Sequence, residues 1–366
     1  MAHPWSSIDS VKRDCRWFKG HIPCTPHKQY GVHCIDEQNL PCPHYEHLTS
    51  KILIIKLGAI GDVIRTTPLL RALKDRFPHA QIWWLTFFPE VLPSSVDIIL
   101  PFTPQSLATL QPVHFDILFN LDKDREACAL ASGLQAGIKK GYVLVDGMPA
   151  PADRDAEHKF MTGLFDDLNR ENTKSYPEEI FEMCGLAFGG ERYVLDTFGD
   201  RGYKWKLPAK KKIVGLNTGC GGRWVSRRWP ERYWVSLART LKQKGYVPLL
   251  LGGEAEHETN KRIARKSGAR YLGTFPLPQF INLVAQCHLV VTAVTMAMHI
   301  TIGLGRKIVL FNNIFNKHEF ELYGLGEILE PEFDCPCFFT PVCPNDCMQY
   351  LFPGRVFASI ERLLPR

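Results

Sequence analysis

The sequence predicts an α/β protein with two domains, each built on a parallel sheet. Residues 51–73 and 213–244 both show a short apolar strand, a glycine-containing turn and an amphipathic helix. This order is the first half of a βαβ unit, and its turn lies at the end of the strand where open α/β sheets bind ligands. The length of 366 residues supports a second domain, because single cores seldom grow beyond ~250–300 residues.

The composition is that of a soluble globular protein, with 45% hydrophobic and 22% charged residues. The net charge of +6 is too small for a dedicated nucleic-acid binder, but it suits anionic substrates or an anionic membrane surface. No apolar run reaches ~18 residues, and residues 1–13 lack the apolar core of a secretory signal. We therefore expect a cytoplasmic protein without a nucleic-acid partner.

Residues 1–48 form a segment of their own, in which histidines and prolines separate four cysteines. The cysteines follow the spacing C-x8-C-x9-C-x7-C and are Cys15, Cys24, Cys34 and Cys42. The segment has little apolar periodicity, so a bound metal would have to supply its folding energy. In a reducing compartment, four thiolates favour structural zinc over disulfides. Free thiols without a metal and an iron–sulfur cluster are the two alternatives.

A second group of cysteines lies in the tail, residues 331–366, before a predicted closing helix at 353–364. Its members are Cys335, Cys337, Cys343 and Cys347. These thiols are also candidate metal ligands. One site shared with the N-terminal segment, two separate sites and free thiols all fit the sequence.

Residues 49–190 are predicted to form the first α/β domain. After the strand at 52–55, Gly58 and Gly61 bend the turn, and Asp62 follows at the mouth of the predicted site. Its amphipathic helix continues to residue 73. Further strands are predicted at 81–87, 96–100 and 115–120, then a helix at 127–134, a short strand after 139 and a polar helical stretch at 153–186.

A linker is predicted at 191–210 and a second α/β domain at 211–330. The linker prediction rests on its glycines, a proline and a lysine run. The second domain alternates strands at 213–217, 246–251, 289–292 and 307–311 with helices at 231–244, 256–267, 280–285 and 295–304.

Two features of these turns carry candidate chemistry. The Asp62 carboxylate can act as a general base toward an acceptor hydroxyl, or it can simply cap the following helix. The glycine turn at 219–222 can bind an anion through its N–H groups, and Arg223, Arg227 and Arg228 can bind a diphosphate bidentately. A solvated basic loop is the alternative for this second feature.

Other motifs narrow the functional class. The sequence lacks H-E-x-x-H, G-x-S-x-G and a complete Walker motif, which argues against a zinc protease, an α/β-hydrolase and a P-loop ATPase. The opening turn also lacks G-x-G-x-x-G with a following acid, which lowers the case for a dehydrogenase or epimerase.

Taken together, the motifs at 56–63, 67–73, 227–231, 252–254, 295–299 and 303–305 resemble those of glycosyltransferase family 9. This family comprises the heptosyltransferases that build lipopolysaccharide cores, and the resemblance covers about residues 50–365. It implies a GT-B fold: two Rossmann-like domains face each other across a cleft, and the last helix returns to the first domain. It also implies inverting, metal-independent transfer of a heptose-like sugar from a nucleotide diphosphate, commonly ADP-heptose. The implied acceptor is lipopolysaccharide-type, another glycan or lipid-linked, with peripheral contact to the inner membrane.

The resemblance also implies roles for individual residues. Asp62 would be the catalytic base, and Arg227 stands where the family often carries a lysine that neutralises the leaving diphosphate. The implied donor-binding residues are Thr218, Gly219, Arg227, Arg228, Gly253, Glu254, Thr295, Met298 and His299, with Glu256 as an alternative to Glu254.

The sequence departs from the family at one motif. The family's Asp-Thr-Gly-Pro-Met-His reads Val-Thr-Met-Ala-Met-His here, so Val294 and Met296 replace an aspartate and a glycine. Our second hypothesis is therefore a non-catalytic binding or scaffold protein that has lost part of the donor site.

Overall fold

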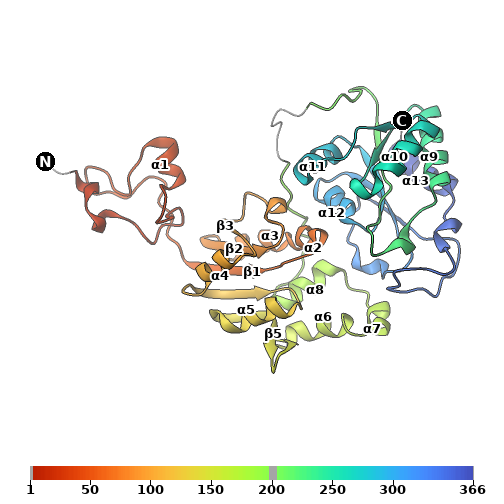
Figure 1. The fold of residues 1–366 in the computed structure, drawn as a ribbon. Coiled ribbons are helices and arrows are strands. Elements are labelled where there is room, and N and C mark those ends of the chain that lie inside the picture. The colour runs from red at the N-terminus through yellow and green to blue at the C-terminus, as the bar shows by residue number, and fades with distance from the viewer. Residues whose placement is uncertain (1–2, 198–203, 366) are drawn as a thin grey trace.

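The computed structural model describes residues 3–197 and 204–365. Two six-stranded sheets with flanking helices lie next to each other, and the N-terminal segment projects from the first of them (Figure 1). The predicted α/β fold with two Rossmann-like domains is confirmed. Within the predicted linker, residues 198–203 lie outside the described residues.

The first sheet has the strand order β3-β2-β1-β4-β5-β6, in which only β6 is antiparallel to its neighbour. Its strands are β1 (Ser50–Ile55), β2 (Ala80–Thr86), β3 (Ile98–Pro101), β4 (His114–Asn120), β5 (Gln135–Val145) and β6 (Met148–Pro151). β1 lies at the centre because its apolar residues 52–55 are buried on both faces, as parallel sheets require.

The second sheet has the order β12-β11-β10-β7-β8-β9 and is wholly parallel. Its strands are β7 (Ile213–Asn217), β8 (Val247–Leu251), β9 (Arg270–Tyr271), β10 (Leu289–Ala293), β11 (Lys307–Phe311) and β12 (Gly326–Leu329). In each sheet the strand order thus reverses beside the first strand, between β1 and β4 in the first sheet and between β7 and β10 in the second. Ligands bind at the carboxyl ends of the strands at such switch points.

Helices cover the faces of both sheets. Around the first sheet lie α2 (Ile60–Thr66), α3 (Leu69–Arg76), α4 (Pro104–Leu110), α5 (Arg125–Gly133), α6 (Glu157–Thr162), α7 (Asp166–Glu171) and α8 (Tyr176–Met183). The second half contains α9 (Glu231–Gln243), α10 (His257–Ser267), α11 (Leu277–Ala285), α12 (Met296–Gly303) and α13 (Pro353–Leu363), and the N-terminal segment contains α1 (Thr25–Tyr30). The longest described helix, α9, has 13 residues, and none of the described helices is long and apolar enough to cross a membrane.

Several predicted elements differ in length. The stretch 153–186 is three short helices, because Gly163 ends α6 and Ser175 starts α8 with a capping box to Glu178. Pro68 divides the predicted opening helix into α2 and α3. β5 is longer than predicted and turns into β6 through Asp146 and Gly147, whose φ angles of 48° and 77° suit a tight hairpin.

The closing helix corrects a prediction. α13 packs on α9, β11 and β12, and Val356 and Ile360 share a core with Trp234 and Leu241. The expected return of the last helix to the first domain is therefore wrong. Its apolar face instead covers the second sheet, where apolar side chains would otherwise be exposed.

The N-terminal segment docks on the first sheet. The Arg16 guanidinium donates to Asp97 at 2.7 Å, and the Gln81 amide donates to the Arg16 carbonyl at 3.3 Å. This segment and the C-terminal tail lie at opposite ends of the molecule (Figure 1), so a metal site shared by the two cysteine groups is contradicted.

The close pairing of β5 with β4 at Gly141 can be tested by measuring stability. Gly141 has φ of +88°, and a Cβ there would collide with the carbonyl oxygen of Asn120, whereas Gly147 has φ of +77° and open space around it. We expect Gly141→Ala to lower the free energy of unfolding by roughly 3 kcal/mol or more, because strain and collision add. The control Gly147→Ala, with strain alone, should lose about 1 kcal/mol. Equal losses in urea denaturation would contradict this packing.

Candidate active site between the two domains

Asp62 lies in the first turn of α2, immediately beyond β1. One carboxylate oxygen accepts a hydrogen bond from the Ala59 N–H at 3.1 Å, and the other pairs with the Arg65 guanidinium at 2.7 Å. The capping interaction is therefore present. The same carboxylate also lines the interdomain cavity, so capping and a chemical role are compatible.

Charges around Asp62 keep it ionised. Burial acts to raise its pKa, but the charges of Arg65 and Lys56 outweigh that effect and lower the pKa to about 2. Lys56 is itself held by Asp122, which also accepts a hydrogen bond from the Leu57 N–H and so fixes the turn after β1. The site thus presents a permanent negative charge at neutral pH.

Arg65 joins the two halves of the molecule. Besides Asp62, it lies 3.7 Å from the Glu319 carboxylate of the second half, and its guanidinium stacks 3.4 Å from the ring centre of Tyr176. Its Nε is buried and has no hydrogen-bond partner among the described residues. The orientation of the Asp62 carboxylate therefore depends on a residue that also contacts the opposite half.

A close approach of α2 and α12 completes this side of the site. A Cβ on Gly61 would lie 2.5 Å from Cδ2 of His299, so only glycine admits the imidazole here. Burial and Arg65 lower the pKa of His299 to about 3, against the opposing effect of Asp62, so the ring is neutral. Its Nδ1 is buried without a partner in the described part of the chain.

A cavity of about 740 Å³ lies between the two halves, a size typical of ligand sites. Its first-half wall contains Gly61, Asp62 and Phe88. Its second-half wall includes most of the predicted donor-binding residues, namely Gly219, Arg227, Gly253, Glu254, Thr295 and His299.

Arg227 is the most unusual group in this cavity. Its side chain is 8% exposed, yet no carboxylate of the described residues pairs with it. One guanidinium nitrogen donates to the Cys220 carbonyl at 2.6 Å, the plane lies 5.3 Å from the Phe315 ring centre, and Nε is unpartnered. Burial without a counter-charge lowers its pKa to about 10. A buried cation of this kind is costly unless an anion joins it.

Acidic and glycine residues shape the wall beside Arg227. The Glu256 carboxylate accepts from the Gly253 N–H at 3.0 Å, and its oxygen would lie 2.7 Å from a Cβ on Gly219. Glu254 accepts from the Thr274 hydroxyl at 3.0 Å. Glu256 therefore lies closer to the glycine turn than Glu254, and it was only the alternative in the sequence-based prediction.

Three predicted donor residues do not line the cavity. The Thr218 hydroxyl donates to Asn260 at 2.7 Å, Met298 is fully buried in the core, and Arg228 is exposed outside the cavity. Gly58 also lies outside its lining, whereas Gly61 lies within it. Cavity residues that the sequence analysis missed include Asn217, whose amide donates to the Thr295 hydroxyl at 3.4 Å, and Phe315 under Arg227.

The two departures from the family motif lie at this site. Val294 and Met296 both line the cavity, next to Thr295 at the start of α12. Apolar side chains thus replace a carboxylate and a bare backbone on the donor side.

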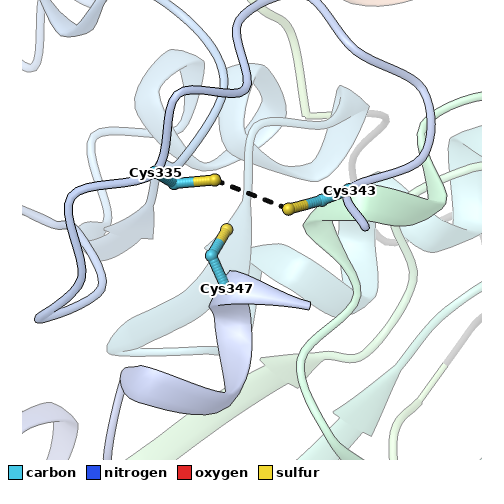
Figure 2. Close-up of side chains that lie close together, drawn as sticks. All are labelled: Cys335, Cys343 and Cys347. Atoms are coloured by element: carbon cyan, nitrogen blue, oxygen red, sulfur yellow. Dashed lines mark hydrogen bonds between the residues drawn. The ribbon is translucent and has the colours of Figure 1, made fainter. Parts of the chain in front are cut away.

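The tail cysteines form a compact cluster. The sulfur atoms of Cys335, Cys343 and Cys347 all lie within 4.8 Å of one another, and Figure 2 shows the three thiols pointing toward a common centre. The Cys335 and Cys343 sulfurs are 3.5 Å apart. These residues could hold a metal ion.

The N-terminal cysteines do not form the compact metal cluster that the sequence predicted for residues 1–48. Cys15, Cys24, Cys34 and Cys42 all line one cavity of about 270 Å³, together with His27, His33 and His44. Their sulfurs do not form a compact group like that of the tail, which is the one such group among the described residues. The cysteine cluster thus lies at 335–347 and not in the N-terminal segment, where the four cysteines only line a common cavity.

Sequence comparisons relate this chain to one family of enzymes. The family model described as glycosyltransferase family 9 (heptosyltransferase) matches residues 170–319. Lipopolysaccharide heptosyltransferase 2 of Salmonella typhimurium is 31% identical over 292 residues, which cover 71% of this chain and 81% of that protein.

Solved structures share the fold. The crystal structure of a family 9 glycosyl transferase from Veillonella parvula has a TM-score of 0.67 at 18% identity, covering 87% of this chain and 98% of that one. The E. coli ADP-heptose lps heptosyltransferase II has a TM-score of 0.60 at 20% identity, covering 86% and 98%. Its sequence identity to the Salmonella enzyme shows that this chain belongs to glycosyltransferase family 9, and the fold and the cleft between its two domains agree.

Proposed function

We propose that this protein transfers a heptose-like sugar from a nucleoside diphosphate donor of the ADP-heptose class to a hydroxyl of a lipopolysaccharide-type glycan, with inversion. The observation that carries the proposal is the buried, uncompensated Arg227 guanidinium on one wall of a cavity whose other wall holds the ionised Asp62. A diphosphate supplies the missing negative charge, and a carboxylate across the cavity can receive a proton.

The reaction follows from these two positions. The acceptor oxygen forms a bond to the anomeric carbon while its proton passes to the Asp62 carboxylate. The bond from that carbon to the diphosphate breaks, and its electron pair leaves on the phosphate oxygen. Arg227 and the N–H groups of the turn at 219–222 stabilise this charge, so the proposal needs no metal at the diphosphate.

The rest of the cavity suits a nucleoside. The apolar side chains of Leu277 and Phe280 can cover a base, and the Glu254 and Glu256 carboxylates can accept hydrogen bonds from ribose hydroxyls. The Salmonella relative is named for lipopolysaccharide, and the net charge of +6 suits an anionic surface. We therefore place the protein in the cytoplasm, peripheral to the inner membrane.

A second candidate function follows from Val294 and Met296. These side chains line the donor wall where a carboxylate and a glycine are absent, which favours a scaffold that keeps the fold without turnover. Calorimetry with ADP-, UDP- and GDP-sugars, followed by a transfer assay, separates the two. Binding together with transfer supports the enzyme, whereas no binding by any sugar nucleotide supports the scaffold.

Asp62→Asn tests the base. The amide oxygen can still accept the Ala59 N–H, but it cannot take a proton. We expect kcat to fall at least 10²-fold, since general bases contribute roughly 10²–10⁴-fold, while the donor Kd changes less than about twofold. Transfer at the wild-type rate by the asparagine variant would assign the base elsewhere.

Arg227→Ala tests the diphosphate site, with the neighbouring exposed Arg228→Ala as its matched control. A charge-assisted hydrogen bond contributes about 1.5–3 kcal/mol, so we expect ADP to bind roughly 10- to 100-fold more weakly to Arg227→Ala. Adenosine, which has no phosphates, should bind all three proteins alike. A similar loss of ADP affinity in both variants would argue against a specific role for Arg227.

The pH dependence tests the electrostatics of Asp62. Its pKa of about 2 means that wild-type kcat/KM should show no acidic limb from this group above pH ~4. Arg65→Gln removes the largest charge that lowers the pKa, so the acidic limb should move to higher pH and activity should be lost earlier as pH falls. Arg71→Gln, an exposed change on α3, is the control and should leave the profile unchanged. An Arg65→Gln profile identical to wild type would show that the ion pair does not control this carboxylate.

A further inference from the structure

The tail cluster has the dimensions of a single-ion site. In a tetrahedral zinc tetrathiolate, sulfurs lie about 3.8 Å apart, because each Zn–S bond is about 2.3 Å. The Cys335 and Cys343 sulfurs are 3.5 Å apart, and Cys347 lies within 4.8 Å of both. The Cys337 sulfur lies outside this compact group, but its thiol interacts with the Cys335 and Cys343 thiols, which makes Cys337 the candidate for the fourth ligand.

Amide groups around the cluster support thiolate ligands. The Asn313 side-chain amide donates to the Cys347 sulfur at 3.2 Å, and the Asn345 amide approaches the Cys335 sulfur at 3.9 Å. Such outer hydrogen bonds orient metal-bound thiolates and stabilise their charge.

The chain between Cys337 and Cys343 contacts the loop that carries Arg227, called the donor loop below. The Ser226 N–H donates to the Pro341 carbonyl at 2.9 Å, and its hydroxyl donates to the Thr340 carbonyl at 2.8 Å. Both acceptors lie between Cys337 and Cys343, in the loop that a metal ion would close. Ser226 is the residue before Arg227.

Two further contacts extend this connection. The Asn313 amide that donates to Cys347 also donates to the Ser226 carbonyl at 2.9 Å, so one side chain links a thiol to the donor loop. Phe339 packs edge-on to Phe315 at 5.1 Å, and Phe315 is the ring beneath the Arg227 guanidinium.

The loop needs an external constraint to keep this shape. Residues 335–347 contain three prolines, and no α-helix or strand runs through them. Phe339 and Asp346 have φ angles of 43° and 46°, which side chains larger than glycine rarely adopt. Metal coordination on both sides of Phe339 would supply the constraint.

We infer that Cys335, Cys337, Cys343 and Cys347 bind one zinc-class ion, and that this ion positions Arg227 for the donor diphosphate through Ser226, Asn313 and Phe315. The positioning role rests on the proposed function, whereas the metal site does not. Zinc here performs no chemistry on the substrate. It acts on the affinity for the two phosphates and leaves the affinity for the nucleoside unchanged.

Metal content and spectroscopy test the site itself. In protein purified without chelator, Cys347→Ser should lower the zinc content by one ion per chain relative to wild type. Cobalt added to the chelator-treated protein should give the absorption of a tetrahedral thiolate complex, and Cys347→Ser should lose it. A Cys335–Cys343 disulfide in freshly purified protein, or equal zinc content in both proteins, would overturn the metal site.

Binding experiments test the positioning role. We expect chelator-treated full-length protein to bind ADP about tenfold more weakly, to bind adenosine unchanged and to recover with added zinc. Asn313→Leu should keep its zinc yet lose ADP affinity, because it breaks the link and leaves the thiols intact. Cys24→Ser, in the distant N-terminal segment, is the control and should bind ADP normally.

The outcomes separate the two proposals. Normal ADP affinity in both the metal-free protein and Asn313→Leu would overturn the positioning role, even if zinc is present. If Arg227→Ala with full zinc also binds ADP normally, the diphosphate assignment fails and the metal site stands alone. Parallel losses of ADP and adenosine affinity would indicate general unfolding and would contradict a role confined to the phosphates.

Discussion

The burial of the Arg227 guanidinium without a carboxylate partner is the constraint on which the rest of the site depends. A desolvated cation in a protein interior needs a compensating anion, and no described residue supplies one. The cavity that Arg227 lines is shared with Asp62, whose charge is already neutralised by Arg65 and Lys56. Asp62 thus has paired cations, whereas the Arg227 guanidinium lacks a paired anion. This difference fits the proposed transfer from a nucleoside diphosphate sugar, since the leaving diphosphate is anionic and the attacking hydroxyl is neutral.

The two halves are joined at the reacting end of the cleft by close packing and charge. Gly61 admits His299 against α2, and Arg65 contacts both Asp62 and Glu319. The neutral imidazole adds no positive charge, so it does not compete with the arginines for the donor. The orientation of the Asp62 carboxylate, the proposed base, thus depends on Arg65, which contacts both domains.

The strand–turn–helix repeats could be predicted from local patterns, because buried parallel strands are short apolar runs and glycine turns follow them. Asp62 and Arg227 could also be placed at the cleft, since both follow a first strand of a sheet.

The motif did not separate Met298 from its neighbours as a donor-binding residue. Met298 lies on the core face of α12, whereas Met296 and His299 face the cavity. Arg227 ends a one-turn 3₁₀ helix and is buried, whereas Arg228 follows that helix and is exposed, and no sequence pattern encodes this difference. The contact between the tail and Ser226 joins residues more than a hundred positions apart, so local sequence patterns could not predict it. α13 was misplaced because an amphipathic pattern shows that a face is buried without showing against which sheet.

The most direct test is a crystal structure of the protein with ADP bound. The account predicts diphosphate oxygens about 3 Å from the Arg227 guanidinium and from N–H groups of the turn at 219–222, with Asp62 facing the open position beyond the second phosphate. A diphosphate bound elsewhere, with Arg227 still buried and unpaired, would contradict the central claim.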